Sequence, residues 1–336
     1  MKFRRLGRSN LEVSQLCLGT MMFGDQTDAA ASADIVAAAR ERSVNFIDTA
    51  DVYSVGRSEE VVGRLIADDR DRWILATKMG NRMSGRRNES HYSRKWVIQA
   101  AEASLARLGT DYIDILYLHR DFEDENLEEP LRALDDLIRA GKIRYYGVSN
   151  FRGWRIAEMV RLAGTIGMPA PAVCQPYYNL LNRMPEVDLL PACGYYGLGV
   201  VPYSPVARGV LTGKYLPGQA PAADSRAGRG DRRLMETEWR PESIEIAQRL
   251  AVHARERGVT PTQFAVAWVL ACQHVSSVIG GPRTLAQWLD YFGAEDFAWT
   301  DADEQRVDAQ VVPGHSSTPG YHDPSYPFYG RRKAGA

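Results

Sequence analysis

The chain has 336 residues, of which 45% are hydrophobic and 25% are charged, and these values exclude a disordered or fibrous protein. Lys and Arg together number 41 and Asp and Glu number 42, so the net charge of −1 gives no electrostatic reason to expect binding to nucleic acid or to an anionic membrane. No stretch approaches the roughly 18 consecutive apolar residues of a membrane span, and the basic start of the chain lacks the apolar segment of a secretory signal.

Within the first fourteen residues, two short segments flank Gly7–Asn10, a pattern that resembles a β-hairpin. Apolar runs typical of strands then alternate with amphipathic runs typical of helices. The predicted strands are Leu16–Gly19, Val44–Asp48, Trp73–Lys78, Ile113–His119, Ile143–Ser149, Val173–Gln175, Gly199–Tyr203 and Ser277–Gly280. The predicted helices begin near Ala29, Ser58, Ser93, Leu127, Arg152, Glu186, Pro261 and Thr284.

Several helix starts carry local signals. Ser58 is followed by two glutamates, which the positive end of the helix dipole favours. Ser93 opens a run with helical apolar spacing that Gly109 ends. Pro261 suits the first turn of its helix, where a missing N–H costs nothing.

Eight strands that alternate with eight helices indicate parallel βα units, and the continuous apolar strands indicate a sheet covered on both faces. Such units form either an open doubly wound sheet or a (β/α)8 barrel. Eight units over most of the chain favour the (β/α)8 TIM barrel, whose usual size is about 250 residues plus insertions. We therefore expect residues 1–336 to form a single domain, with a barrel core at about 15–293 and a C-terminal tail at about 300–336.

Two segments depart from the βα rhythm. The long loop Leu216–Pro241, after the seventh strand, is polar and rich in Gly, Pro and Arg, and loops of this length are usually functional or disordered. The C-terminal tail from Val311 carries four Pro and four Gly together with four aromatic residues, Tyr321, Tyr326, Phe328 and Tyr329. Because a solvated linker rarely holds so many aromatic side chains, we expect this tail to be an ordered loop packed on the barrel.

Several familiar motifs are absent. No GxGxxG follows the first strand, so the Rossmann fingerprint is missing. The run Gly209–Tyr215 is one residue short of a P-loop and has Tyr where Ser or Thr must hold magnesium. No GxSxG, HExxH or CxxC occurs, and the six histidines are scattered, so we expect no metal site. The four cysteines are Cys17, Cys174, Cys193 and Cys272, and their pattern fits a reduced, cytoplasmic protein.

Polar residues end the predicted strands, at the edge where parallel barrels place their active sites. Asp48, Lys78 and His119 end the second, third and fourth strands, and Tyr53 follows five residues after Asp48. A lysine in a partly desolvated place needs a counterion, which Asp48 supplies. The ammonium group is expected to lower the pKa of a nearby phenol, so that Tyr53 can exchange a proton with a carbonyl or alcohol oxygen. A hydride would then have to come from a cofactor.

Each of these residues, taken singly, has a purely structural interpretation. An Asp at a strand end often caps the next helix, a Tyr in a loop usually packs, and a Lys at a strand end often extends to water. Their placement at three successive strand ends favours a catalytic role over a purely structural one.

The chain resembles the aldo-keto reductase superfamily, and the similarity extends from about Phe3 to Gly293. The segments that carry the resemblance are NFIDTADVYSVGRSEEVVG, WILATKMG, DYIDILYLHRD, GKIRYYGVSNF, QPYYNLLNR, VPYSPVARGVLTGKY and SVIGGPRTLAQ. The resemblance implies a (β/α)8 barrel that binds NADP(H) and moves a hydride between nicotinamide and a carbonyl group. By motif, Tyr53 would be the general acid, Lys78 and Asp48 would tune it, and His119 would orient the substrate carbonyl.

The resemblance also implies a cofactor site. Ser149, Asn150 and Gln175 match positions that hold the nicotinamide carboxamide, and Tyr203 matches the aromatic residue that stacks on the nicotinamide ring. The remaining cofactor positions expected on this basis are Gly19, Thr20, Met21, Asp48, Ser204, Pro205, Val206, Arg208, Gly209, Leu211, Gly213, Lys214, Arg226, Ile279, Gly281, Arg283, Gln287 and Asp290.

Arg283 matches the position near the adenosine ribose and is the candidate for a 2′-phosphate, which a guanidinium group pairs bidentately. We therefore expect NADP(H) to be preferred over NAD(H). The chain departs from many relatives at Gly280, where they have Pro, and at Tyr291, where they have Asn near the adenine. In the long loop, Arg226 is the best candidate for a lid over the cofactor phosphates, although a solvated loop is the simpler interpretation.

Expected substrate-pocket residues are Met22, Phe23, Tyr53, Trp96 and His119, with Trp239 and Tyr321 as further candidates. An apolar, aromatic pocket suits a hydrophobic aldehyde or ketone, including a ring ketone, a sugar or a xenobiotic. A dehydrogenase that works in the oxidising direction would use the same residues. A second alternative is an NADP(H)-binding partner subunit with little turnover, because the same superfamily includes channel-associated subunits. The sequence does not indicate the oligomeric state.

Overall fold

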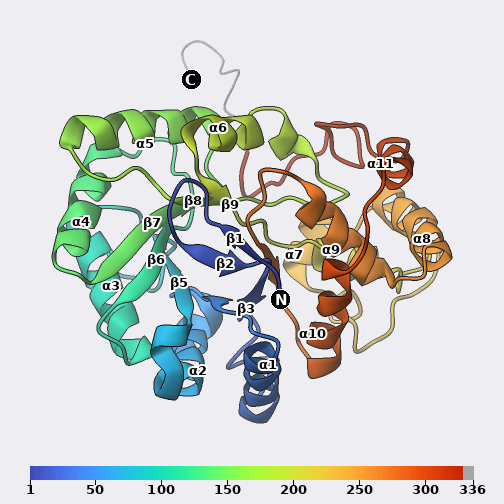
Figure 1. Cartoon of the computed structure of the whole chain (residues 1–336), viewed down its shortest axis with the longest axis horizontal. Helices are drawn as coiled ribbons and strands as arrows, with labels where there is room; N and C mark the ends of the chain where they lie inside the picture. The colour runs from blue at the N-terminus through green and yellow to red at the C-terminus, as the bar shows by residue number, and fades with distance from the viewer. Residues whose placement is uncertain (328–336) are drawn as a thin grey trace.

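A computed structural model describes residues 1–327 of the chain. Its centre is a parallel sheet with the neighbour order β10-β3-β4-β5-β6-β7-β8-β9. The outer strands also meet, because Val200 of β9 forms a parallel bridge with Val275, and Ile279 of β10 donates its N–H to the Pro202 carbonyl at 3.0 Å. The sheet therefore closes into the predicted (β/α)8 barrel (Figure 1). Its strands are β3 (Leu16–Gly19), β4 (Phe46–Asp48), β5 (Ile74–Met79), β6 (Ile113–Leu118), β7 (Ile143–Ser149), β8 (Val173–Gln175), β9 (Gly199–Val200) and β10 (Val278–Gly280).

Helices surround the barrel, and the eight predicted ones are present. They are α1 (Ala29–Glu41), α2 (Arg57–Ile66), α3 (Arg94–Leu108), α4 (Glu128–Arg139), α5 (Gly153–Ile166), α6 (Leu189–Tyr196), α9 (Pro261–Ala271) and α10 (Leu285–Tyr291). The predicted start of α3 is confirmed, because the Ser93 hydroxyl accepts from the Trp96 N–H at 3.3 Å. Its predicted end at Gly109 is confirmed by a left-handed residue with φ of 62°.

Three further helices were not predicted from the sequence: α7 (Arg232–Thr237), α8 (Pro241–Glu256) and α11 (Asp301–Asp308). The segment predicted as one long loop therefore contains the short helix α7 and ends where α8 begins. Short 3-10 turns complete the chain: η1 (Tyr53–Gly56), η2 (Ala67–Arg72), η3 (Met184–Glu186), η4 (Ala207–Thr212) and η5 (Phe292–Glu295).

The predicted N-terminal hairpin consists of β1 (Phe3–Arg5) and β2 (Glu12–Ser14), which pair antiparallel. Leu6 and Val13 are fully buried and join the cluster of side chains that fills the barrel interior, together with Phe46 and Tyr117. The hairpin therefore closes the amino-terminal end of the barrel, and the opposite end stays open.

The C-terminal tail packs on the barrel over its described part. The Ser317 N–H donates to the Leu181 carbonyl at 2.9 Å, and the Arg240 guanidinium lies 3.8 Å from the centroid of the Tyr321 ring. The expectation of an ordered, packed tail is thus confirmed as far as residue 327. Phe328 and Tyr329 lie outside the described residues. Within residues 1–327, no helix is long and apolar enough to cross a membrane.

The barrel helices α2 and α3 approach closely at Gly63. A Cβ atom at this position would lie 2.2 Å from the Leu108 carbonyl oxygen, which belongs to the backbone of α3 and cannot rotate away. Because overpacking costs about 1–3 kcal/mol, we expect Gly63→Ala to lower the free energy of unfolding by an amount in this range, measured in urea titrations.

Gly164 provides the matched control, because it also lies in a helix, α5, and no heavy atom lies within 4 Å of its added Cβ. Gly164→Ala should raise the free energy of unfolding by up to about 1 kcal/mol, the helix-propensity gain. Equal effects of the two substitutions would contradict the packing argument.

Candidate functional site

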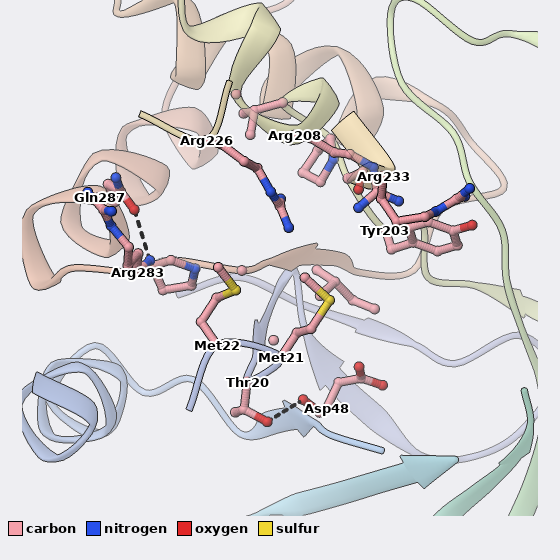
Figure 2. A pocket seen from close by; sticks show the side chains of 18 of the residues that line it. Thr20, Met21, Met22, Asp48, Tyr203, Arg208, Arg226, Arg233, Arg283 and Gln287 are labelled. Atoms are coloured by element: carbon pink, nitrogen blue, oxygen red, sulfur yellow. Dashed lines mark hydrogen bonds between the residues drawn. The ribbon is translucent and has the colours of Figure 1, made fainter. Parts of the chain in front are cut away.

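A cavity of about 510 Å³ opens at the carboxyl ends of the barrel strands. Most of the predicted site residues line it. Among its lining residues are Gly19, Thr20, Met21, Met22, Asp48, Tyr53, His119, Ser149, Asn150, Gln175, Tyr203, Ser204, Pro205, Val206, Arg208, Gly209, Lys214, Arg226, Ile279, Gly281, Arg283, Gln287 and Asp290 (Figure 2). The cavity thus collects residues that are as far apart in the sequence as Gly19 and Asp290.

A buried ion pair lies at the floor of this cavity. Asp48 ends β4 and Lys78 lies in the neighbouring strand β5, and both side chains face the barrel interior with exposed fractions of 3% and 0%. The Lys78 ammonium donates to Asp48 Oδ1 at 2.5 Å and to the Thr49 carbonyl at 2.8 Å. Gln175 donates from Nε2 to Asp48 Oδ2 at 2.9 Å. Both charges therefore have partners despite their burial, as buried ions require.

Tyr53 contacts the ion pair from the loop after β4. The Lys78 ammonium lies 3.2 Å from the Tyr53 hydroxyl oxygen and donates to it. The loop is held in place by the Ser54 hydroxyl, which donates to the Phe23 carbonyl at 3.0 Å. Ser54 and Val55 both adopt the left-handed conformation, with φ of 50° and 56°, a strained arrangement of the kind that recurs at functional sites.

The direction of the Tyr53 pKa shift differs from the sequence-based expectation. Burial raises the pKa of the Tyr53 hydroxyl, the Lys78 ammonium lowers it, and the Asp48 carboxylate raises it, so the net shift is upward. For Lys78, burial lowers the pKa, but Asp48 and Tyr53 outweigh burial and the net shift is again upward. At neutral pH the site therefore holds a neutral phenol beside an ammonium group, so Tyr53 has a proton available to donate.

His119 follows β6 and faces Tyr53. The two rings meet edge to face with centroids 6.0 Å apart, and the backbone N–H of His119 donates to the Met79 carbonyl at 2.9 Å. Burial and the nearby Lys78 ammonium hold the pKa of His119 well below its usual range, so the imidazole is neutral. A neutral imidazole beside a neutral phenol can hydrogen-bond to a carbonyl oxygen without adding charge.

The polar residues after β7, β8 and β9 are linked by hydrogen bonds. Asn150 donates from Nδ2 to the His119 carbonyl and to the Ser149 hydroxyl, each at 3.0 Å. The Tyr203 hydroxyl donates to Asn150 Oδ1 at 2.7 Å, and the Ser149 hydroxyl donates to the Gln175 carbonyl at 2.9 Å. These residues, which the resemblance assigns to the nicotinamide site, therefore form one connected wall of the cavity.

Basic side chains occupy the other side of the cavity. Arg226 points into the space above Met22, and Arg208 and Arg233 lie toward Tyr203 (Figure 2). Lys214, Arg229 and Arg283 also line the cavity. Such a row of cations suits a ligand with several phosphate groups.

The segment around residues 224–229 reaches across the basic side of the cavity. Arg283 donates to the Asp224 carbonyl at 3.2 Å, and Arg229 donates to Gln26 Oε1 at 2.9 Å; Thr27, next to Gln26, donates to the Arg283 carbonyl at 3.1 Å. Arg226 itself is paired with Asp231 at 2.9 Å. The long loop after β9 therefore reaches the segments that follow β3 and β10, and the lid over the cofactor phosphates stays a prediction.

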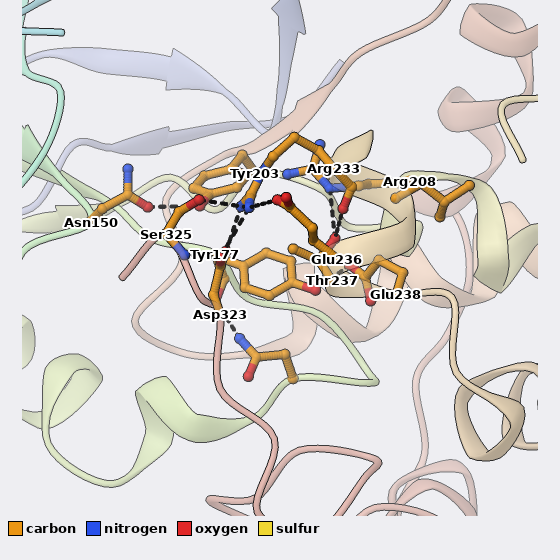
Figure 3. Close-up of polar contacts among 12 residues, drawn as sticks. Asn150, Tyr177, Tyr203, Arg208, Arg233, Glu236, Thr237, Glu238, Asp323 and Ser325 are labelled. Atoms are coloured by element: carbon orange, nitrogen blue, oxygen red, sulfur yellow. Dashed lines mark hydrogen bonds and ion pairs between the residues drawn. The ribbon is translucent and has the colours of Figure 1, made fainter. Parts of the chain in front are cut away.

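The C-terminal tail forms the remaining rim, although with Tyr326 rather than with Tyr321, the tail residue that the sequence analysis named as a pocket candidate. Tyr326 lines the cavity, and Arg120 donates to the neighbouring Ser325 carbonyl at 2.7 Å. Asp323 pairs with Arg233 of α7 at 2.5 Å (Figure 3). The aromatic content of the tail was the signal for this role, and it led to Tyr321 instead of Tyr326.

A model of the Aldo/keto reductase family matches residues 15–311. The chain belongs to the aldo/keto reductase family. It is 37% identical over 301 residues to a probable voltage-gated potassium channel subunit beta of rice, Oryza sativa, with 88% of this chain and 92% of the relative covered. It is 33% identical to an uncharacterized oxidoreductase of Bacillus subtilis, with 94% and 97% covered, and 33% identical to the versiconal hemiacetal acetate reductase of Aspergillus parasiticus, with 83% and 88% covered.

Some predicted site residues of this aldo/keto reductase family member do not line the cavity. Phe23 is fully buried and packs in the core between the barrel and its helices, as does Trp96 in the first turn of α3. Leu211 is also a core residue, and Gly213 packs on Ala251 with a left-handed φ of 73°. These four residues therefore do not belong to the lining of the cavity.

Trp239 and Tyr321, the further pocket candidates, also lie outside the lining. Trp239 packs edge to face on Tyr215, with ring centroids 4.9 Å apart, and Tyr321 lies on Arg240. Conversely, the cavity includes residues that the sequence analysis did not assign to it, among them Val52, Asn81, Thr262 and Tyr326, and it includes Tyr291 as well as Arg229 and Arg233 of the long loop. Within the described residues, no group of three or more His, Cys, Asp or Glu side chains could hold a metal ion.

Asp51, two residues before Tyr53, is a buried carboxyl group with an uncommon environment. Neither of its oxygens has a hydrogen-bond partner among the described side chains and backbone, apart from a weak contact with the Val52 N–H. Burial and the nearby Glu59 raise the pKa of Asp51 to about 8. Because an unfolded Asp titrates near pH 4, the folded state holds an extra proton between about pH 4 and 8.

The free energy of unfolding should therefore fall as the pH rises through this window. The side chain that Asp51→Asn introduces cannot ionise, so the variant does not lose this stability as the pH rises. The difference in free energy of unfolding, Asp51→Asn minus wild type, should therefore be about 1–3 kcal/mol larger at pH 8.5 than at pH 5.5, since one pKa unit corresponds to about 1.4 kcal/mol. Urea unfolding at both pH values measures this difference, with the exposed Asp111→Asn as control. The same relative stability of Asp51→Asn at both pH values would contradict the assignment.

Proposed function

We propose that the protein is an NADP(H)-dependent oxidoreductase that reduces an aldehyde or a ketone to the alcohol, with Tyr53 as the general acid. The observation that carries this proposal is the contact of Asp48, Lys78, Tyr53 and His119 at the floor of a cavity whose other side is basic. The family assignment and the reductase and oxidoreductase among its relatives support the same reaction class.

The cavity fits a nicotinamide dinucleotide in shape and charge. Gly281 leaves open space at the rim, since nothing lies within 4 Å of an added Cβ, and the guanidinium groups beside it match phosphate oxygens. Ser149, Asn150 and Gln175 would hold the carboxamide end, Tyr203 would support the ring, and Arg226, Lys214 and Arg208 would face the phosphates. The bound cofactor supplies the hydride.

The protein's own residues handle the proton. The Tyr53 hydroxyl donates it to the substrate carbonyl oxygen, and the Lys78 ammonium stabilises the phenolate that remains. The Asp48 carboxylate keeps Lys78 charged and fixed, and the neutral His119 orients the carbonyl oxygen. Each group is within contact distance of the next, so no rearrangement of the floor is needed.

The substrate end of the cavity is mixed in character. Val52 and Tyr326 supply apolar and aromatic surface near Tyr53, and Met22 adds apolar surface elsewhere in the cavity. Such a lining suits a hydrophobic or ring-shaped carbonyl compound better than a small, highly charged one. We propose a small-molecule substrate of that class and a cytoplasmic location, which fits the four free cysteines.

Tyr53→Phe tests the acid. The variant keeps the ring but loses the proton, so kcat for carbonyl reduction should fall at least about a hundredfold, the usual contribution of general acid catalysis. Its dissociation constant for NADPH should stay within about twofold, by fluorescence titration. Turnover is followed as loss of NADPH absorbance with a panel of aldehydes, ketones and keto-sugars. Full activity of Tyr53→Phe would remove Tyr53 from the mechanism.

Arg283→Ala tests the cofactor preference. If Arg283 binds the 2′-phosphate, its loss should weaken NADPH binding by tenfold or more, the range of a lost charged hydrogen bond, and should leave NADH binding nearly unchanged. Arg132→Ala on the surface of α4 removes the same charge far from the cavity and is the control. Equal weakening of NADPH and NADH binding would show that Arg283 contacts a part common to both cofactors and not the 2′-phosphate.

A second candidate function is an NADP(H)-binding partner subunit with little turnover, which the name of the rice relative favours. It predicts tight NADPH binding with no turnover across the substrate panel. Oxidation of an alcohol by NADP⁺ uses the same residues, so the panel includes alcohols.

A further inference from the structure

A buried carboxyl group lies behind the wall that supports the nicotinamide ring in the proposed function. Glu238 directly follows α7, and its side chain is fully buried. The Tyr177 hydroxyl donates a short hydrogen bond to Glu238 Oε1. Oε2 has no hydrogen-bond partner in the part of the chain that the structure describes. A buried carboxyl group is costly, and the proposed mechanism has not used this one.

Tyr177 connects this carboxyl group to the cavity. Its ring stacks on the ring of Tyr203, with centroids 5.6 Å apart and 28° between the planes. Tyr203 lines the cavity and donates to Asn150, which donates to the His119 carbonyl. Figure 3 shows Glu238, Tyr177, Tyr203 and Asn150 in this order, from behind the wall to the catalytic end. The carboxyl group is therefore separated from the cavity by two stacked aromatic rings.

The charges that face Glu238 favour its ionised form. Burial raises the pKa of Glu238 and outweighs the groups that lower it, so the net shift is upward; those groups are the hydrogen bonds from Tyr177 and Asn179 and the Arg208 and Arg240 guanidinium groups. Arg208 lines the cavity and donates to the Thr237 hydroxyl at 3.1 Å. Arg240 lies behind it and contacts the tail through Thr318 at 2.8 Å. Glu238 therefore interacts with two guanidinium groups, those of Arg208 and Arg240, and is the acidic residue among the three.

We propose that Glu238 is a positioning residue for hydride transfer, which holds the Tyr177–Tyr203 stack and places a negative charge behind the nicotinamide ring. This inference rests on the proposed function. A bound nicotinamide cofactor would supply a hydride, with its two electrons, to the substrate carbon and would carry one more positive charge in its oxidised form, while Tyr53 would supply the proton to the substrate oxygen. A fixed negative charge at low dielectric stabilises a cation that develops nearby. Glu238 would therefore favour the reducing direction on the enzyme.

The two cofactor forms isolate this effect. NADPH and NADP⁺ have the same adenosine and the same phosphates, so contacts with Arg283 or Lys214 contribute equally to both. They differ in the charge of the nicotinamide ring. The ratio of the two dissociation constants, Kd(NADP⁺)/Kd(NADPH), therefore reports the electrostatic environment of the ring without any turnover.

The experiment is a fluorescence titration of the full chain with each cofactor form at pH 8. Glu238→Gln keeps an acceptor for Tyr177 and removes the charge, and we expect its Kd ratio to rise at least threefold over the wild type. Glu238→Asp keeps the charge and should stay closer to the wild-type ratio than Glu238→Gln. Glu242→Gln, which removes the same charge at an exposed position in the first turn of α8, should leave the ratio unchanged.

An unchanged ratio in Glu238→Gln, or an equal rise in Glu242→Gln, would overturn the inference. If Glu238→Gln does not fold, as judged by thermal melting, Glu238→Ala removes the same charge, and its ratio decides in the same way. Failure of the wild type to bind either cofactor form would instead reject the proposed function. The two failures are therefore distinguishable.

Discussion

The buried ion pair between Asp48 and Lys78 is the constraint on which the rest of the site depends. Two charges at the floor of a barrel are costly to desolvate, and the loss of one partner would leave the other charge unpaired, at a cost of about 3–5 kcal/mol. The arrangement of the barrel strands offsets this desolvation cost by giving both charges close partners. Neighbouring parallel strands bring the two side chains to 2.5 Å, and Thr49 and Gln175 supply the remaining hydrogen bonds. Tyr53 can be held against an ammonium group only because that group is fixed in this way.

Much of the fold could be predicted because parallel barrel strands are buried on both faces and therefore appear as unbroken apolar runs. All eight strands lie where those runs predicted them, although the seventh ends at Val200 rather than Tyr203, since Pro202 brings no N–H to the ladder. The helix α8 was missed because it follows directly on a polar, Gly-rich loop. Its start at Pro241 is a recognised first-turn signal that was assigned to the end of the loop.

Some residues of the site lie where the sequence predicted them and others do not, and each case has a physical cause. The motif gave the order of residues, but the direction of each side chain depends on turns that only the folded backbone settles. Met22 faces the cavity, whereas its neighbour Phe23 faces the core. For Tyr53, the sequence revealed the nearby charge but not the degree of burial, and burial reversed the direction of the pKa shift. Contacts made by the tail join residues more than 80 positions apart, such as Arg233 and Asp323, and no local pattern indicates them.

The hairpin that covers the amino-terminal end leaves the barrel interior open at its carboxyl-terminal end alone. Leu6 and Val13 fill its base, so water, protons and small ions reach Lys78 from the mouth alone. The dielectric environment of the ion pair is then set by a part of the molecule that no substrate touches. Loops at the mouth can change length and composition over evolutionary time, and new specificities can arise there, while the acidity of the phenol below is preserved.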